Sequence, residues 1–160
     1  MLGINLLACV VAGSSASVEP VRVKPAVSYT ELSPVRALLN GNGGTEWLNF
    51  GLWRKMSPSA SYATSAEALA DAVSEAAGVV TGDIVLEAGG GRGDNALRLL
   101  QHFGASKVYG INYSLEETEA AQLRVLSAGL SDRAVLRQGD AGSDLSAFVP
   151  PSSVQRVVAV

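Results

Sequence analysis

The 160-residue sequence has very little of the two residue types that most often build metal sites and disulfide frameworks. Cysteine occurs once, at Cys9, and histidine occurs once, at His102. A single cysteine forms no intramolecular disulfide, and one cysteine with one histidine cannot assemble a Cys/His metal cluster. We therefore expect no resident metal ion.

Charge is also scarce, at 17% of the residues, and neither sign dominates. Twelve basic and fifteen acidic residues give a net charge of −3, so the chain has no basic field that could hold a nucleic-acid backbone. Hydrophobic residues make up 48% of the chain, which excludes an intrinsically disordered protein. The composition favours one folded domain without a nucleic-acid partner.

The N-terminal apolar run, Leu2–Ala12, is too short to span a bilayer, which takes about 20 apolar residues. Small residues follow it, as in a secretory signal peptide, but no Lys or Arg precedes it. We interpret residues 1–19 as a hydrophobic leader or signal-like segment. Contact with a membrane through residues 1–17 is an alternative that the sequence also allows. Residues 20–63, which begin with a proline-containing extended stretch, are assigned to a linker and N-terminal cover segment.

Helical and strand patterns alternate from residue 64 onward. Thr64 or Ser65 can cap the first helix, and Ser114 with Glu117 forms a capping box for the last. The predicted helices cover residues 64–78, 95–103 and 115–128, and the predicted strands cover 84–86, 107–111, 135–136 and 154–160. This alternation predicts an α/β fold with a parallel sheet over residues 64–160.

A glycine-rich loop, Glu87–Gly93, joins the first predicted strand to the helix that follows it. Ligands of open parallel sheets bind beyond the carboxyl ends of the strands, where a helix N-terminus offers free N–H groups. The dinucleotide fingerprint would require glycine where the chain has Asp94, and no Gly-Lys-Ser/Thr follows to make a P-loop. A glutamate at the strand end suits a ligand that carries an ammonium group. The alternative is a connection that binds nothing.

Polar residues also follow the second and third predicted strands, at the same edge of the sheet. Asn112 can serve a ribose diol, and Asp140 can accept a hydrogen bond from an exocyclic amine. Each residue taken singly is typical of an ordinary turn. Polar elements at three successive strand ends together indicate a nucleoside-binding crevice.

The pattern resembles the class I S-adenosylmethionine-dependent methyltransferases. Glu87–Gly93 matches the family's E/D-x-G-x-G-x-G motif, Gly110–Ser114 matches its second motif, and Gly139–Ala141 matches its third. The upstream Asn49–Trp53 is similar to the small-molecule branch, whose members methylate quinones, tocopherols, sterols or natural products. The resemblance covers roughly residues 45–160.

The resemblance implies a Rossmann-like fold and S-adenosylmethionine as the cofactor. The residues that it places around the cofactor are Glu87, Gly89, Gly90, Gly91 and Gly93 for the methionine part, Asn112 with the adjoining Tyr113 for the ribose, and Asp140 with Ala141 for the adenine. Gly90 stands where the family often has cysteine, and we expect this change to be neutral. Tyr62 and Trp53 are expected to close over the cofactor.

Methyl transfer to a small-molecule acceptor is the activity that the resemblance implies. The sequence identifies no catalytic base, and we interpret His102 as a solvated or packing residue. The family's sheet has more strands than this chain accounts for, so the chain is interpreted as a C-terminally incomplete, cofactor-binding half with strands one to four. The alternative is a non-catalytic S-adenosylmethionine-binding fragment, or a subunit completed by a partner chain. Because the cofactor is made in the cytosol, a cytoplasmic location is expected.

Overall fold

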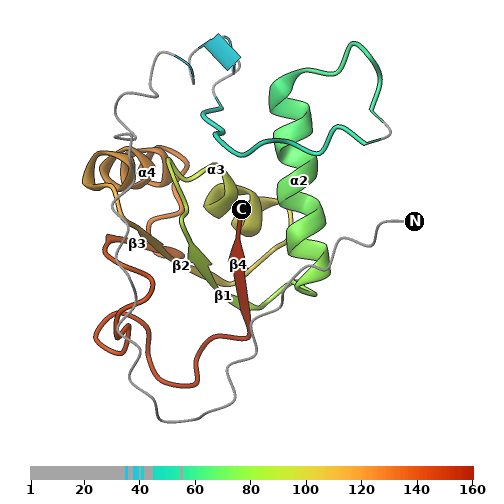
Figure 1. The fold of residues 1–160 in the computed structure, drawn as a ribbon. Coiled ribbons are helices and arrows are strands. Elements are labelled where there is room, and N and C mark those ends of the chain that lie inside the picture. Colours follow the sequence, from blue (N-terminus) through green and yellow to red (C-terminus); the bar gives the residue numbers. More distant parts are fainter. Residues whose placement is uncertain (1–34, 36–37, 40, 42–44, 55) are drawn as a thin grey trace, which may run out of the picture.

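The computed structural model describes residues 35, 38–39, 41, 45–54 and 56–160. From residue 45 onward, helices and strands alternate along the chain (Figure 1). The helices are α2 (Tyr62–Ala76), α3 (Asp94–Gln101) and α4 (Leu115–Ser127), and the strands are β1 (Ile84–Ala88), β2 (Lys107–Asn112), β3 (Ala134–Gln138) and β4 (Arg156–Ala159). The predicted α/β alternation is confirmed.

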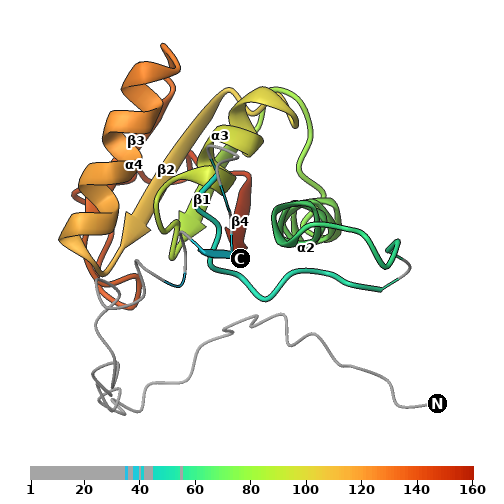
Figure 2. The same cartoon turned by 90° about the horizontal axis from the view of Figure 1, so that it is seen from above.

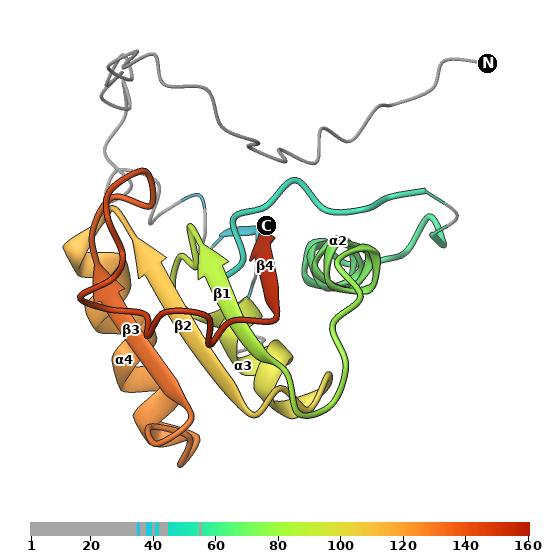
Figure 3. The ribbon, with the colours of Figure 1, turned by 90° about the horizontal axis from the view of Figure 1, so that it is seen from below.

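The strands form one parallel sheet in the order β3-β2-β1-β4 (Figure 3). One register row crosses all four strands, with Glu87 between Gly110 and Val158, and Leu136 on the far side of Gly110. The order reverses at β1, because the chain moves outward through β2 and β3 and then returns to the other side of β1. In open α/β sheets, such a reversal marks the place where ligands bind.

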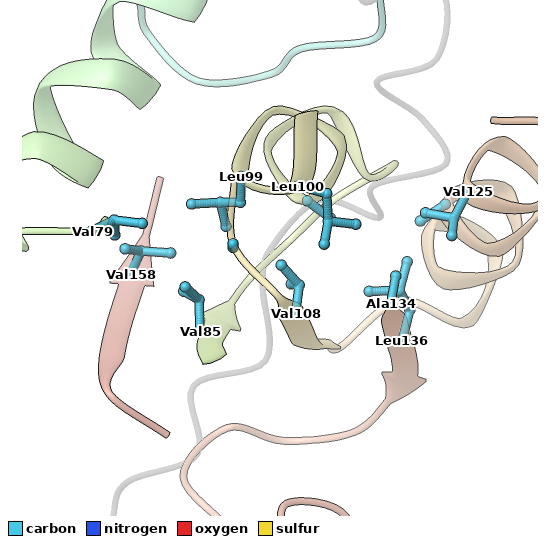
Figure 4. Packing of buried hydrophobic residues seen from close by; sticks show 12 residues of the cluster. Val79, Val85, Leu99, Leu100, Val108, Val125, Ala134, Leu136 and Val158 are labelled. Carbon is cyan, nitrogen blue, oxygen red and sulfur yellow. The ribbon is translucent and has the colours of Figure 1, made fainter. Parts of the chain in front are cut away.

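The main hydrophobic core lies between the sheet and the helices α3 and α4 (Figure 4). Side chains alternate between the two faces of a strand, so Val85 and Val108 point toward the helices while their neighbours point away. Leu99 of α3 and Val125 of α4 pack onto them from the helical side. Val85, Val108 and Leu99 are each 0% exposed. This packed layer therefore holds β1 and β2 in position, and with them the carboxyl edge of the sheet.

The opposite face of the sheet is covered by the β3–β4 connection, residues 139–155, which contains no helix (Figure 3). Phe148 from this connection meets the ring of Tyr109 edge-on, with ring centroids 5.6 Å apart. The guanidinium of Arg137 lies over the same Phe148 ring, 5.2 Å from its centroid. These contacts explain why Tyr109 is buried although no helix of the described residues covers it.

Helix α2 lies beside α3 and extends the row of helices past β4 (Figure 2). Its N-cap is Ser61, whose Oγ accepts a hydrogen bond from the N–H of Thr64. The predicted cap at Thr64 or Ser65 is therefore wrong, because Ser65 is buried inside the helix and donates to the carbonyl of Tyr62. The helix begins before the domain boundary predicted at residue 64.

The predicted leader, residues 1–19, lies outside the described residues, as does much of the cover segment 20–63. Among the described helices, none has the length and apolar character needed to cross a membrane. The domain boundaries therefore stay a prediction.

Candidate functional site

A cavity of about 320 Å³ lies at the carboxyl edge of the sheet. The end of β1 and the glycine loop form its floor, and the first turns of α3 and α4 contribute to its wall. Residues 46–50 of the N-terminal segment line the opposite side. The cavity therefore lies at the reversal point of the sheet, where the strand order predicts a ligand.

Glu87, the last but one residue of β1, is the most unusual group in this cavity. Its side chain is 1% exposed, and neither carboxylate oxygen has a hydrogen-bond partner. Burial raises the pKa of Glu87 from 4.5 to about 7; the nearby Asn95 amide opposes this rise, and repulsion from Asp94 adds to it. A buried carboxylate without a partner is costly unless a cation binds it.

The glycines of the loop leave Glu87 the space that it occupies. A Cβ atom on Gly90 would lie 2.7 Å from the Oε2 atom of Glu87, closer than non-bonded atoms can approach. The carboxylate of Glu87 would have to shift to admit a larger residue here, and the expected neutrality of glycine in place of cysteine stays a prediction. At Gly93, φ is +88° and a Cβ would lie 3.0 Å from the Cβ of Ala121, so glycine there lets α3 and α4 approach closely.

Asp94 opens α3 with a negative charge, but that charge is paired within the protein. The two carboxylate oxygens of Asp94 accept from Nη1 and Nη2 of Arg124 at 2.6 and 2.7 Å. They also accept from the backbone N–H of Glu46 at 3.2 Å. Hydrogen bonding to Asp94 raises the pKa of Arg124 above its ordinary value.

Arg92 extends this ion pair into a network that we name the clasp, which comprises Glu46, Arg92, Asp94 and Arg124. Arg92 forms an ion pair with the carboxylate of Glu46, and its backbone carbonyl accepts from Nη1 of Arg124 at 3.1 Å. The clasp joins three segments that are distant in sequence, namely the N-terminal segment, the glycine loop and α4. It holds the N-terminal segment against the cavity.

The N-terminal wall of the cavity is fixed by hydrogen bonds to α2. Nδ2 of Asn49 donates to the carbonyl of Ala66 at 3.0 Å, and its Oδ1 accepts from the N–H of Gly51 at 2.8 Å. The hydroxyl of Tyr62 donates to the carbonyl of Asn49 at 2.5 Å. Tyr62 thus supports the wall from behind instead of closing over the cavity as expected.

Trp53 does not line the cavity either. Its Nε1 donates to the carbonyl of Phe50 at 3.0 Å, and half of its surface is exposed. Phe50 lines the cavity and is 92% exposed. The exposed aromatic residue of the cavity wall is therefore Phe50, which the sequence did not single out.

The structure brings together five of the residues that the sequence predicted around a cofactor. Those lining the cavity are Glu87, Gly89, Gly90, Gly91 and Asn112. The loop is tied to β2 because the N–H of Gly89 donates to the carbonyl of Ile111 at 2.8 Å. Oδ1 of Asn112 accepts from the N–H of Tyr113.

The remaining predicted residues lie outside the cavity wall. Tyr113 is 56% exposed, and Gly93 borders a smaller cavity next to Gly110. Asp140 forms a turn in which its Oδ1 accepts from the N–H of Gly142 at 2.9 Å, and Ala141 is exposed. The cofactor roles of these residues stay predictions.

Two polar residues that the first turns of α3 and α4 contribute to the wall were missed by the sequence analysis. Glu117, 2% exposed, was explained by its position in the first turn of a helix, but it faces the cavity, unlike the exposed Glu116 and Glu119. Asn95, 4% exposed, follows Asp94 in the first turn of α3. Their positions just after strand ends were the signal that could have identified them.

The described residues contain no group of three His, Cys, Asp or Glu side chains arranged to hold a metal ion.

A family model described as a methyltransferase domain matches residues 85–160, which run from β1 to the end of β4. The match contains the glycine loop, Asn112 and Asp140. Residues 85–160 are part of a class I methyltransferase domain.

Solved structures show the same fold as this methyltransferase domain. The [4+2]-cyclase SpnF is 28% identical with a TM-score of 0.60, over 71% of this chain and 40% of that one. Geranyl diphosphate methyltransferase is 24% identical with a TM-score of 0.56, over 67% of this chain and 44% of that one. Geranyl diphosphate C-methyltransferase from Streptomyces coelicolor A3(2) is 21% identical with a TM-score of 0.51, over 66% of this chain and 42% of that one.

The chain spans less than half of the length of these solved structures. A search of curated proteins finds no match. The methyltransferase domain is therefore placed in its family by the family model and by its fold.

Proposed function

We propose that the chain binds S-adenosylmethionine and forms the cofactor-binding part of an enzyme that transfers a methyl group to a small molecule. The observation that carries the proposal is the buried, unpartnered carboxylate of Glu87 at the floor of the cavity. A class I methyltransferase domain surrounds it. S-adenosylmethionine carries an ammonium group, and this cation can pair with the buried carboxylate of Glu87.

The chain's residues fit the other parts of the cofactor as well. Gly89, Gly90 and Gly91 leave the loop backbone open to the cavity, so that a ligand can approach the chain closely. Asn112 offers an amide at the end of β2, where it can hydrogen-bond a ribose diol. Two of the similar structures contain sinefungin or S-adenosylhomocysteine, which supports the same ligand class here.

The bound cofactor would supply a methyl group on a sulfonium. The chain's own contribution is to orient that group and to keep water away from it. Methyl transfer is an in-line displacement, so holding the reacting atoms in line accounts for much of the rate. Trp47 and Leu48, together with the exposed ring of Phe50, give the cavity an apolar side that suits this role.

We propose a small organic molecule as the acceptor. The names of two similar structures specify geranyl diphosphate as the methylated compound, and the net charge of −3 argues against a nucleic acid. A cytoplasmic location belongs to the same proposal, because the cofactor is made in the cytosol.

Calorimetric titration of the 160-residue chain with S-adenosylhomocysteine, the demethylated cofactor, tests the proposal. We expect one site per chain. Glu87→Ala should abolish the heat of binding while leaving the circular-dichroism spectrum unchanged. Absence of binding to a folded wild-type chain would overturn the proposal.

A second candidate function is binding of the same ligand without methyl transfer. It is favoured by the likeness to SpnF, whose name describes ring formation instead of methylation. The same candidate includes a subunit completed by a partner chain. Turnover of methyl-labelled cofactor with a panel of small acceptors separates transfer from binding alone, and sedimentation of the chain with cell extract tests for the partner.

A further inference from the structure

Phe50 is a large apolar residue that has no partner of its own kind inside the protein to cover it. It lines the cavity and is 92% exposed. Single exposed apolar side chains are common on protein surfaces and need no explanation. Phe50 differs from these because it belongs to the wall of a cavity of about 320 Å³. A molecule bound in that cavity can cover it.

The cavity has two sides of different chemical character. The polar side comes from the end of β1, the glycine loop and the first turns of α3 and α4, and it carries the groups proposed to hold the cofactor. The other side, which we name the apolar side, consists of Trp47, Leu48, Phe50, Leu69 and Val160. Methyl transfer needs the acceptor and the cofactor next to each other. The apolar side is the part of the wall that the proposed cofactor contacts leave free.

The backbone that carries Phe50 is fixed by hydrogen bonds on both of its flanks. The carbonyl of Phe50 accepts from Nε1 of Trp53 at 3.0 Å. The carbonyl of Asn49 accepts from the hydroxyl of Tyr62 at 2.5 Å, and Oδ1 of Asn49 accepts from the N–H of Gly51 at 2.8 Å. A segment that is ordered before a ligand arrives loses less entropy on binding. Phe50 is therefore a preorganised contact for an apolar molecule.

The charges at the cavity favour an acceptor without a charge. Among the described residues that line it, Arg92 is the only basic one, and it forms ion pairs with Glu46 and Glu116. An anionic acceptor would meet acidic residues on this wall, and like charges in an interface are unfavourable. The apolar side carries no charged side chain, so a cationic acceptor would lose its hydration there without gaining a partner.

We propose that the apolar side binds the methyl acceptor, that Phe50 is a specificity-determining residue in contact with it, and that the acceptor is an uncharged molecule with an apolar body. This inference rests on the proposed function, because it assumes that the polar side takes S-adenosylmethionine. It narrows the small organic acceptor to one chemical class and assigns a role to a residue outside the cofactor motifs.

The test compares three ligands that share one hydrocarbon chain and differ in the charge at its end. Geraniol is uncharged, geranyl diphosphate is anionic and geranylamine is cationic. Each is titrated calorimetrically into the full chain saturated with S-adenosylhomocysteine. We expect geraniol to bind at least tenfold more tightly than either charged ligand.

Variants of Phe50 show whether the ligand lies on the apolar side. Phe50→Ala should weaken geraniol about tenfold, because the apolar contact area is lost, while S-adenosylhomocysteine stays within twofold. Phe50→Leu keeps an apolar side chain and should bind geraniol within threefold of wild type. Leu123→Ala is the matched control, since Leu123 is 64% exposed but lies on α4 outside the cavity wall. It should change neither affinity. The Tm of Phe50→Ala should equal that of wild type, because Phe50 is exposed.

Four outcomes would overturn the inference while leaving the proposed function standing. They are a loaded chain that does not bind geraniol, tighter binding of either charged ligand, geraniol affinity that Phe50→Ala leaves unchanged, and equal weakening of geraniol and S-adenosylhomocysteine by Phe50→Ala. The last result would place Phe50 in the cofactor site. A folded chain that does not bind S-adenosylhomocysteine at all would refute the proposed function, and this inference with it.

Discussion

At the scale of single residues, the candidate site is built from groups that reduce the stability of the fold. Glu87 is fully buried without a partner, and Asn95 is a buried amide in the same cavity wall. Neither group is needed to hold β1 or α3 together, because Val85 and Leu99 anchor those elements in the core. Residues that cost stability without structural benefit are typical of binding sites.

The raised pKa of Glu87 gives a prediction about stability and pH. Its pKa is 4.5 in an ordinary environment and about 7 in the fold, so between these values the folded state binds more protons than the unfolded state. Stability therefore falls as the pH rises from 4.5 to 7, and the full cost, about 3 kcal/mol, is present above pH 7. Glu87→Gln should remove this cost.

We expect urea unfolding to show Glu87→Gln as more stable than wild type at pH 8, with the difference shrinking toward zero near pH 4.5. Glu119→Gln, which changes an exposed carboxylate on α4, serves as the control and should show no such pH dependence. A stability difference for Glu87→Gln that is the same at both pH values would contradict the prediction.

Gly90 allows the position of Glu87 to be tested without altering Glu87 itself. In Gly90→Ala the new Cβ would lie 2.7 Å from Oε2 of Glu87, so the carboxylate must move. We expect S-adenosylhomocysteine to bind about tenfold more weakly. Gly89→Ala is the matched comparison, because nothing lies within 4 Å of its Cβ but its φ is +77°. That variant should mainly lose stability, by roughly 1 kcal/mol, through backbone strain.

At the scale of elements, the clasp determines where the N-terminal segment lies. The side chain of Asp94 is 6% exposed, and its carboxylate forms an ion pair with the guanidinium of Arg124. Removing one member of a buried ion pair leaves an uncompensated charge. Arg124→Met, which keeps much of the side-chain volume, should therefore destabilise the fold by about 3 kcal/mol. Arg124→Met combined with Asp94→Asn should cost less than the sum of the two single changes.

Hydrogen exchange at the amide of Glu46 reports on the clasp directly, since that N–H is donated to Asp94. Arg124→Met should accelerate this exchange. Arg98→Met is the control, because Arg98 pairs with Asp71 to join α2 to α3 and does not belong to the clasp. Equal acceleration in both variants would mean that the fold loosens as a whole and that the clasp has no local function.

At the scale of the whole molecule, the sequence predicted the architecture well because its signals are local. Val85 and Val108 sit in short apolar runs, and Ser114 caps α4 as expected, with its Oγ accepting from the N–H of Glu117. The spacing of its glycines also predicted the glycine loop. In the structure, Gly91 and Gly93 both adopt the positive φ that such a turn requires. Parallel strands then follow from the alternation with helices.

The parts of the site that the sequence did not reveal depend on contacts between distant segments. Phe50 and Glu46 belong to a segment whose position is determined by α2 and by Arg124, and no periodicity encodes that position. Asn95 and Glu117 look like ordinary residues of helix first turns until the sheet brings those turns to one cavity. Tyr62 was assigned to the wrong side of the wall because its pairing with Asn49 spans 13 residues.

The position of β4 next to β1 has a consequence for the order of events during synthesis. The N–H of Ile84 donates to the side chain of Gln155, which is 71 residues later in the chain. At about 5–20 residues per second, a ribosome needs roughly 4–14 s to make that stretch. During this interval β1 has an open edge, and Val160, which lines the cavity, has not yet been added. The nascent chain can form its helical core early, but it acquires the cavity wall that Val160 contributes only when β4 docks.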